Sequence, residues 1–200
     1  MLRVGLTGGL ASGKSFVGQA LAELGCYLIQ ADELGHQALL PGAEACQAVI
    51  AEFGEQILGP DGAIDRRKLG SLVFEDPARL ARLNALVHPW VIRREEELLA
   101  GFAAREPKGI AVVEAAILIE TGSYRRFDRI VLAVCRPEQQ IERAVERGMS
   151  REEAQARLAR QMPLEQKRQY AHYVIDTSGS REQTLRQVRE LYHWLREMVR

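Results

Sequence analysis

Residues 2–15 read LRVGLTGGLASGKS, in which an apolar run leads directly into a glycine-rich segment. This segment has the pattern Gly-x-x-x-x-Gly-Lys-Ser, formed by Gly8, Gly13, Lys14 and Ser15. Glycines allow the backbone to curl so that successive N–H groups point at an anion, and the helix that follows adds the positive end of its dipole. The spacing therefore predicts a phosphate-binding loop between a strand and a helix, and nucleotide chemistry near the start of the chain.

The residues after the loop support this interpretation. Apolar residues recur at helical spacing from Phe16 to Leu24, and Gly25 ends the pattern. In loops of this type the lysine reaches the β and γ phosphates and the hydroxyl group contacts Mg²⁺. We expect these roles of Lys14 and Ser15.

Length and charge narrow the class of partner. The chain has 200 residues, enough for one domain that buries about 70% of the surface its unfolded chain would expose. Lys plus Arg and Asp plus Glu number 27 each, so nucleic acid is disfavoured as the main partner. No apolar stretch approaches the length of a membrane span, and no cationic-then-apolar leader precedes the first predicted strand. We expect a cytoplasmic protein with no membrane partner.

The cysteines agree with that compartment. Cys26, Cys46 and Cys135 lie far apart, in or beside apolar segments, and form no C-x-x-C pair. They are predicted to be reduced thiols in the core of a cytosolic protein.

Short apolar runs alternate with helical patterns, which favours parallel strands joined by crossover helices. Five strands are predicted, over residues 2–6, 26–30, 109–114, 129–134 and 173–176. The expected fold class is therefore α/β, with a five-stranded parallel sheet.

Two regions are predicted to be helical additions to the sheet. Glycines and prolines divide residues 32–105 into short helices, one of which spans 78–87 and ends before His88 and Pro89. Because ligands of open α/β sheets bind at the carboxyl ends of the strands, we expect this insertion to stand over that edge and contact a second substrate. A pair of helices over 137–147 and 150–161 follows the fourth strand.

Asp32 lies just past the second predicted strand. We expect that strand to end beside the first, so that the Asp32 carboxylate could face the γ-phosphate and take a proton from an acceptor hydroxyl. Asp is also a common N-cap, and Asp32 would cap a helix that begins at Glu33. Both roles remain open, and one Asp can serve both.

Three other features carry chemistry less specifically. Glu114 ends the third strand, where P-loop enzymes hold Mg²⁺, although a solvated carboxylate is the alternative. An isolated histidine such as His88 is more often structural than ligand-binding. The arginines of residues 143–160 alternate with glutamates, as on a solvated helix face, and one or two of them could clamp phosphates.

Several stretches together resemble the dephospho-CoA kinase family over nearly the whole chain. They are GLTGGLASGKS, the Ala31-Asp32 pair, LNALVHPWVIRRE, VVEAAILIETG, the 140–161 region with its ARLARQMPLEQKR ending, and AHYVIDTSGS. The resemblance implies a five-stranded parallel P-loop kinase core with a helical substrate-binding insertion and a helical, mobile lid. It also implies transfer of the γ-phosphoryl group of ATP to the ribose 3′-hydroxyl of dephospho-CoA, with Mg²⁺.

The resemblance also implies the organisation and the site. Residues 1–200 form a single P-loop kinase domain with a core (1–31, 106–136, 163–200), a substrate insertion (32–105) and a lid (137–162). The implied catalytic residues are Asp32, Lys14, Arg143 and Arg147. Those implied for nucleotide binding are Gly8, Gly9, Ala11, Ser12, Gly13, Lys14, Ser15, Phe16, Arg157, Val174, Ser178 and Gly179. The substrate side comprises Asp32, His88, Arg93 and Glu114, and Mg²⁺ falls to Ser15 and Glu114.

The chain departs from the family pattern at several positions. Ala11 replaces a usual glycine, Gln30 the first Asp of D-A-D, and Glu114 and Ala116 the Asp and Pro of D-x-P. His172 and Thr177 replace the Asp and Asn of A-D-x-V-I-D-N. None of these changes removes a group that the chemistry requires. Two alternatives stay open, another small-molecule kinase of shikimate or nucleoside-monophosphate type, and a non-catalytic nucleotide-binding module. We expect a monomer or a small homo-oligomer.

Overall fold

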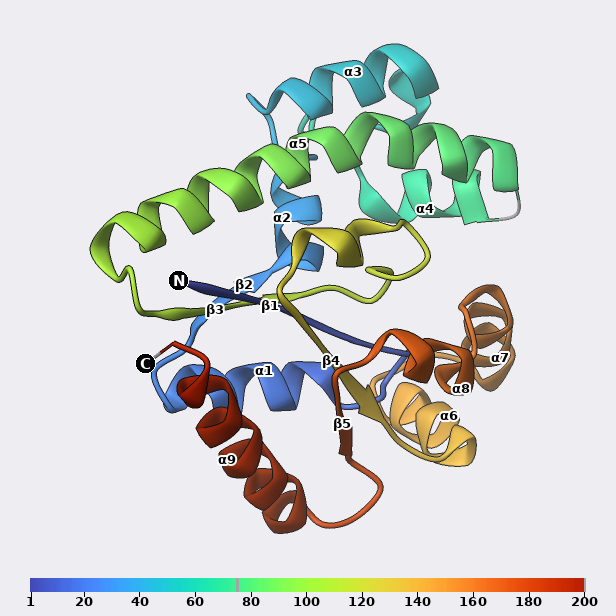
Figure 1. Cartoon of the computed structure of the whole chain (residues 1–200). Coiled ribbons are helices and arrows are strands. Elements are labelled where there is room, and N and C mark those ends of the chain that lie inside the picture. The colour runs from blue at the N-terminus through green and yellow to red at the C-terminus, as the bar shows by residue number, and fades with distance from the viewer. Residues whose placement is uncertain (75, 200) are drawn as a thin grey trace. The chain divides into compact units, whose positions relative to one another are not determined.

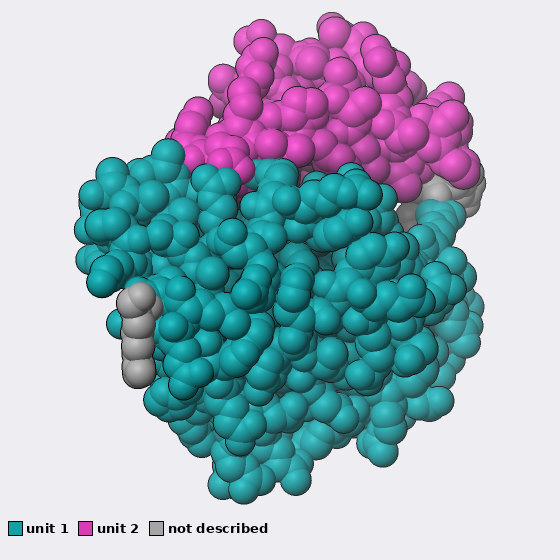
Figure 2. Space-filling model, viewed as in Figure 1, with its two compact units in different colours: residues 1–30, 99–200 teal, residues 31–98 magenta. Residues whose placement is uncertain are grey.

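The computed structural model describes residues 1–74 and 76–199. The chain divides into two compact units, which we call unit 1 (residues 1–30 and 99–200) and unit 2 (residues 31–98) (Figure 2). Each unit has a hydrophobic core of its own, so they are described separately.

Unit 1 contains a five-stranded parallel sheet, which confirms the predicted fold class (Figure 1). The strand order is β2-β3-β1-β4-β5, so β1 is central. The five strands are β1 (Leu2–Gly8), β2 (Tyr27–Gln30), β3 (Ile110–Glu114), β4 (Arg129–Val134) and β5 (Tyr173–Asp176).

The expectation that the second strand ends beside the first is wrong, because β3 lies between them. All five residues of β3 are buried, as suits an interior strand, whereas β2 is partly exposed and forms an edge. In the observed register, Glu114 pairs with Leu6 on one side and with Gln30 on the other.

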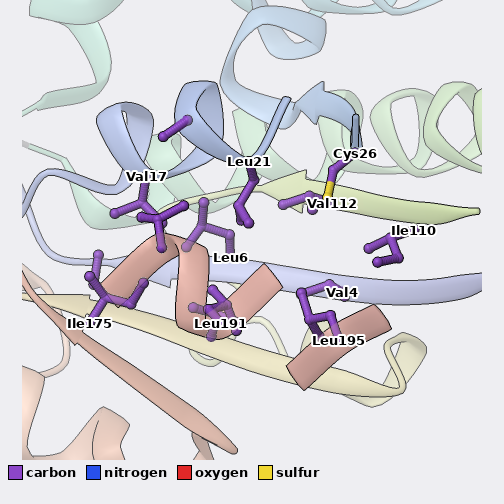
Figure 3. Close-up of a cluster of buried hydrophobic side chains, with 14 of the residues drawn as sticks. Val4, Leu6, Val17, Leu21, Cys26, Ile110, Val112, Ile175, Leu191 and Leu195 are labelled. Atoms are coloured by element: carbon purple, nitrogen blue, oxygen red, sulfur yellow. The ribbon is translucent and has the colours of Figure 1, made fainter. Parts of the chain in front are cut away.

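Two helices cover one face of this sheet, α1 (Lys14–Glu23) and α9 (Arg181–Glu197) (Figure 1). Figure 3 shows Val17 and Leu21 of α1 and Leu191 and Leu195 of α9 packed with side chains of β1, β3 and β5. The apolar residues that recur at helical spacing between the loop and Gly25 therefore form the buried side of α1. Cys26 belongs to this core, and all three cysteines are free and buried, as predicted.

The remaining elements of unit 1 follow β3 and β4. A short 3-10 helix, η2 (Ser123–Arg126), precedes β4. The predicted pair of helices is present as α6 (Pro137–Glu146) and α7 (Arg151–Arg160), and the Ser150 hydroxyl caps α7 by accepting from the N–H of Glu153 at 3.1 Å. Two short helices, α8 (Leu164–Lys167) and η3 (Arg168–Tyr170), lead into β5.

Unit 2 is helical and is built from α2 (Ala31–Gln37), α3 (Glu44–Phe53), η1 (Glu55–Ile57), α4 (Arg66–Phe74) and most of α5 (Pro77–Arg105). Its core is apolar and includes Cys46, Val49, Phe53, Ile57 and Leu69.

The prediction that a helix ends at residue 87 is wrong, since α5 continues through Pro89 to Arg105. A proline inside a helix costs about 3 kcal/mol because it removes a hydrogen bond and clashes with the preceding turn. The apolar side chains of Val91 and Leu99 are buried beyond that point, and their burial offsets this cost. Within the described residues, neither α5 nor any other helix has the length and apolar character of a membrane span.

Candidate active site

The glycine-rich loop leaves the central strand β1 and opens α1 at Gly13. Gly13 has φ +86°, a left-handed conformation that favours glycine, and it offers no side chain to cap the helix. The first N–H groups of an α-helix have no acceptor within the helix. A Cβ on Gly8 would lie 2.2 Å from Ser12 Oγ and 2.8 Å from the backbone oxygen of Ala133 in β4, so the position favours glycine. The loop therefore presents N–H donors and a helix dipole to an anion.

Two further residues of the loop are in unusual surroundings. Ser12 Oγ is buried and has no hydrogen-bond partner among the residues that the structure describes. Ala11, which replaces a usual glycine, adopts a left-handed φ of +50°, and its side chain packs with Ala144 and Ala154 of the two helices that follow β4. An unused hydroxyl group inside a loop of N–H donors fits a site that binds phosphate oxygens.

Three side chains meet where α1 begins and β3 ends. Ser15 Oγ donates to Glu114 Oε1 at 2.5 Å, and Lys14 Nζ lies 3.8 Å from the same oxygen. Gln30 Nε2 donates to Glu114 Oε2 at 3.2 Å. The Glu114 side chain is only 4% exposed, so the alternative of a solvated carboxylate is wrong. Hydroxyl and carboxylate oxygens are ligands of the kind that Mg²⁺ takes.

Both backbone polar groups of Leu10 in the loop are held by glutamine side chains. Leu10 N–H donates to Gln161 Oε1 at 2.8 Å, and Gln140 Nε2 donates to Leu10 O at 2.7 Å. Gln140 is buried in α6, and Gln161 is the residue that ends α7. Sequence reasoning gave these two glutamines no role, because nothing in the sequence distinguishes them from solvent-exposed glutamines.

Thr177, one of the departures from the family pattern, supports the loop from β5. Its hydroxyl group donates to Ser12 O at 2.7 Å and receives a hydrogen bond from Arg143 Nη1 at 3.1 Å. Arg143 Nη2 also donates to Thr177 O at 2.7 Å. The guanidinium of Arg143 is thus fixed next to the residue that holds the loop.

The other predicted nucleotide-side residues are more exposed. Arg147 is the exposed C-cap of α6, and Arg157 forms an ion pair with Glu153 at 2.7 Å. Val174 lies within β5, and Ser178 and Gly179 follow its end. A hydrogen bond from the Ser178 side chain is the main cause that lowers the pKa of Asp176.

Unit 2 contains three of the four residues predicted for the substrate side, and the fourth, Glu114, ends β3 in unit 1. Asp32 is exposed and lies in the first turn of α2, which begins at Ala31, so the N-cap alternative is wrong. His88 was expected beyond a helix end but lies inside α5. Burial lowers the pKa of His88, which favours the neutral imidazole. The packing of α5 past Pro89, given above, explains the difference.

An open groove of about 840 Å³ lies within unit 2. Leu40, Pro41 and Trp90 give it an apolar part, and Arg93 and Arg94 give it cationic groups. Arg93 Nη2 lies 2.5 Å from Glu44 Oε2, and both side chains are largely exposed. Glu33, Glu44 and Glu97 also line the groove, and Arg94 pairs with Glu97 as Arg93 does with Glu44. An anionic ligand could therefore bind there only by replacing a carboxylate on one of these arginines.

A phosphate loop after the central strand of a parallel sheet, with a lysine, a serine and an acidic residue gathered at its mouth, defines a P-loop kinase. The family model of dephospho-CoA kinase matches residues 2–183. This chain belongs to the dephospho-CoA kinase family.

Individual relatives agree with the family model. The chain is 44% identical to dephospho-CoA kinase of Geobacter sulfurreducens, over 94% of this chain and 96% of the relative. It is 38% identical to dephospho-CoA kinase of Aquifex aeolicus, over 98% of both chains. Among solved structures, TT1252 from Thermus thermophilus has a TM-score of 0.84 and 34% identity over 96% of both chains. Dephospho-CoA kinase from Campylobacter jejuni has a TM-score of 0.70 and 24% identity over 98% of both chains, and it supports the fold.

Proposed function

We infer that this protein transfers the γ-phosphoryl group of ATP to the ribose 3′-hydroxyl of dephospho-CoA, which yields coenzyme A and ADP. Membership of the dephospho-CoA kinase family over residues 2–183 carries this conclusion. The cluster of Lys14, Ser15 and Glu114 at the carboxyl ends of β1 and β3 supplies groups that phosphoryl transfer needs.

At the nucleotide end, we propose that the ATP phosphates are bound by backbone N–H groups, the Ser12 hydroxyl and the Lys14 ammonium. The residues involved would be Gly8, Gly9, Ala11, Ser12, Gly13, Lys14, Ser15 and Phe16. Arg143, Arg147 and Arg157 would neutralise further phosphate charge, and Val174, Ser178 and Gly179 would lie beside the adenine. Ser15 and Glu114 would hold Mg²⁺, which neutralises charge on the phosphates when bound. Glu114 is buried and already contacts Lys14 and Ser15, which supports these assignments.

At the acceptor end, we propose that Asp32 is the general base. The 3′-oxygen forms a bond to the γ-phosphorus, the bond from that phosphorus to the β–γ bridging oxygen breaks, and the hydroxyl proton passes to the Asp32 carboxylate. Dephospho-CoA has a pyrophosphate and a long uncharged arm, and we propose that it binds in the groove of unit 2, which Arg93 lines. His88 does not line this groove, and its place on the substrate side rests on the family resemblance. Because Arg93 pairs with an exposed carboxylate, little free energy is needed to release it to the substrate.

The buried thiols of Cys26, Cys46 and Cys135 fit a reducing compartment, and we propose that the protein acts in the cytoplasm.

A coupled assay for ADP release tests the function. Purified protein with Mg-ATP is mixed in turn with dephospho-CoA, AMP, shikimate and no acceptor. We expect rapid ADP release with dephospho-CoA alone. Release with AMP or shikimate but not with dephospho-CoA would leave only the P-loop kinase class, and release that no acceptor increases would favour a nucleotide-binding module.

A further inference from the structure

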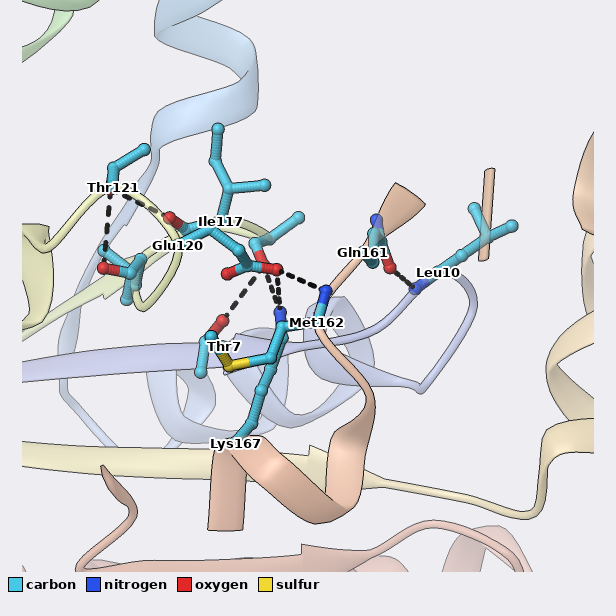
Figure 4. A network of polar contacts seen from close by, with 10 residues as sticks. Thr7, Leu10, Ile117, Glu120, Thr121, Gln161, Met162 and Lys167 are labelled. Atoms are coloured by element: carbon cyan, nitrogen blue, oxygen red, sulfur yellow. Dashed lines mark hydrogen bonds and ion pairs between the residues drawn. The ribbon is translucent and has the colours of Figure 1, made fainter. Parts of the chain in front are cut away.

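Lys167, the last residue of α8, is a fully buried cation in unit 1. Its Nζ donates to Ala116 O at 2.8 Å and lies 2.8 Å from Glu120 Oε1 (Figure 4). Removing an ammonium from water is costly, and a buried ion pair is often no more stable than apolar residues of similar volume. Hydrophobic packing alone therefore does not explain a lysine at this position.

On one side, Lys167 fixes the turn that follows β3. Ala116 O accepts a second hydrogen bond, from Thr7 Oγ1 at 3.2 Å. Thr7 immediately precedes Gly8, the first glycine of the phosphate loop, and Ala116 lies two residues after Glu114. The carbonyl of Ala116 thus ties the ends of β1 and β3 to Lys167.

On the other side, the same ion pair reaches the phosphate loop through the end of α7. Glu120 Oε1 accepts from the N–H of Met162 at 3.2 Å, and the preceding residue, Gln161, accepts from the N–H of Leu10 (Figure 4). A continuous path of bonded groups therefore runs from Lys167 through Glu120, Met162 and Gln161 to Leu10.

We propose that Lys167 is a positioning residue for phosphoryl transfer, which through Glu120 holds Gln161 on the phosphate loop and through Ala116 holds the turn next to Glu114. Lys167 touches neither substrate. This role rests on the proposed function, because the positions of Gln161 and of the turn next to Glu114 matter for the phosphoryl transfer proposed above. A displacement of about 1 Å in a catalytic group can cost roughly 10²-fold in rate even when the altered residue is remote from the chemistry.

The test uses the full-length protein and three variants. Lys167→Met keeps the length of the side chain and removes the ammonium. Lys167→Met/Glu120→Met removes both charges and leaves no unpaired buried charge, so it should fold even where the single variant does not. Arg168→Met is the matched control, since Arg168 is the next residue along the chain and its half-exposed side chain pairs with the exposed Glu165.

Four quantities are measured for each folded variant: the melting temperature, the amide hydrogen exchange at Leu10, kcat, and the KM for dephospho-CoA. In the double variant, we expect a melting temperature close to that of the wild type, roughly tenfold faster exchange at Leu10, and a kcat reduced by roughly 10–100-fold. The KM for dephospho-CoA should stay within about twofold of the wild-type value, because the proposed substrate residues of unit 2, Asp32, His88 and Arg93, are not altered. The control should match the wild type in all four measurements.

A double variant that regains wild-type stability together with wild-type kcat and Leu10 exchange would overturn the proposal and leave Lys167 a structural role. The two readouts also separate this inference from the proposed function. If the wild type fails to phosphorylate dephospho-CoA, the function is wrong, whereas the exchange at Leu10 still decides whether Lys167 holds the loop.

Discussion

The two units of this chain differ in how deeply their charged and polar side chains are buried. Among the described residues, the buried polar and charged side chains belong to unit 1 apart from Glu95, and they include Ser12, Glu114 and Lys167. Unit 2 carries ion pairs that are largely exposed, such as Arg93 with Glu44. Exposed pairs contribute about 0–1 kcal/mol each, whereas loss of one partner of a buried pair costs roughly 3–5 kcal/mol. We therefore expect the proposed phosphate site to be preformed and the groove of unit 2 to rearrange more readily around a ligand.

The largest loss of kcat is expected from Asp32, an exposed residue of unit 2. Such a loss would show that exposed residues of unit 2 can matter as much as the buried ones of unit 1. Asp32→Asn keeps the shape of the side chain and removes its basicity. If proton removal matters, kcat should fall by roughly 10²–10⁴-fold while the affinity for ATP is retained. Steady-state kinetics with a direct ATP-binding measurement check this. Near-normal turnover at unchanged stability would show that Asp32 is not the base.

The next largest effect is expected in unit 1. Lys14→Ala removes an ammonium that, in the proposed role, neutralises the β and γ phosphates more strongly as charge shifts in the transition state. Turnover should fall by ~10²–10³-fold in a protein that remains folded by circular dichroism. A variant within about threefold of the wild type would contradict the assignment of Lys14.

The burial of Cys26 in unit 1 can be tested through the pH dependence of the free energy of unfolding. Burial raises the pKa of Cys26, in the core of unit 1, from 9.0 to about 12. Between pH 9 and pH 12 the thiol loses its proton in the unfolded chain but keeps it in the folded protein, so the free energy of unfolding falls as the pH rises. Below pH 9 the thiol is protonated in both states, and this loss is absent. In urea unfolding, Cys26→Ala should therefore lose less stability than the wild type across this window, by about 1.4 kcal/mol per pH unit. Parallel curves for the two proteins would contradict the raised pKa.

The smallest effect is expected in the groove. Arg93→Ala removes the proposed charge-assisted contact with the substrate, so the KM for dephospho-CoA should rise roughly tenfold and the KM for ATP should stay nearly unchanged. His88→Ala should likewise raise the KM for dephospho-CoA more than the KM for ATP. Arg82→Ala is the matched control, since Arg82 lies in the same helix and forms an exposed pair with Glu52. Equal changes in both KM values would remove Arg93 from the substrate side.

The sequence predicts the sheet and the phosphate loop well because both depend on local patterns. Strands follow from short apolar runs, and the loop follows from the fixed spacing of Gly8, Gly13 and Lys14. The position of β3 between β1 and β2 depends on which strand buries both faces, and short apolar runs do not settle that. The course of α5 past Pro89 likewise depends on tertiary packing that outweighs a local helix-ending signal.

The supporting residues of the site are the hardest to predict. Gln161, Lys167 and Thr177 act through contacts with segments more than 40 residues away in sequence. Their residue types are common on exposed surfaces, so the sequence offers no sign of their burial or partners. Lys14, Ser15 and Glu114 could be proposed because the motif and the strand end mark them directly.

The most direct test of the central claim is the destination of the γ-phosphoryl group. The protein is incubated with dephospho-CoA and ATP that carries ¹⁸O in its γ-phosphoryl group, and the product is analysed by mass spectrometry and ³¹P NMR. We predict coenzyme A with the labelled phosphoryl group on the ribose 3′-oxygen, formed at the same rate as ADP. Label that appears only in inorganic phosphate, while dephospho-CoA remains unchanged, would contradict the account.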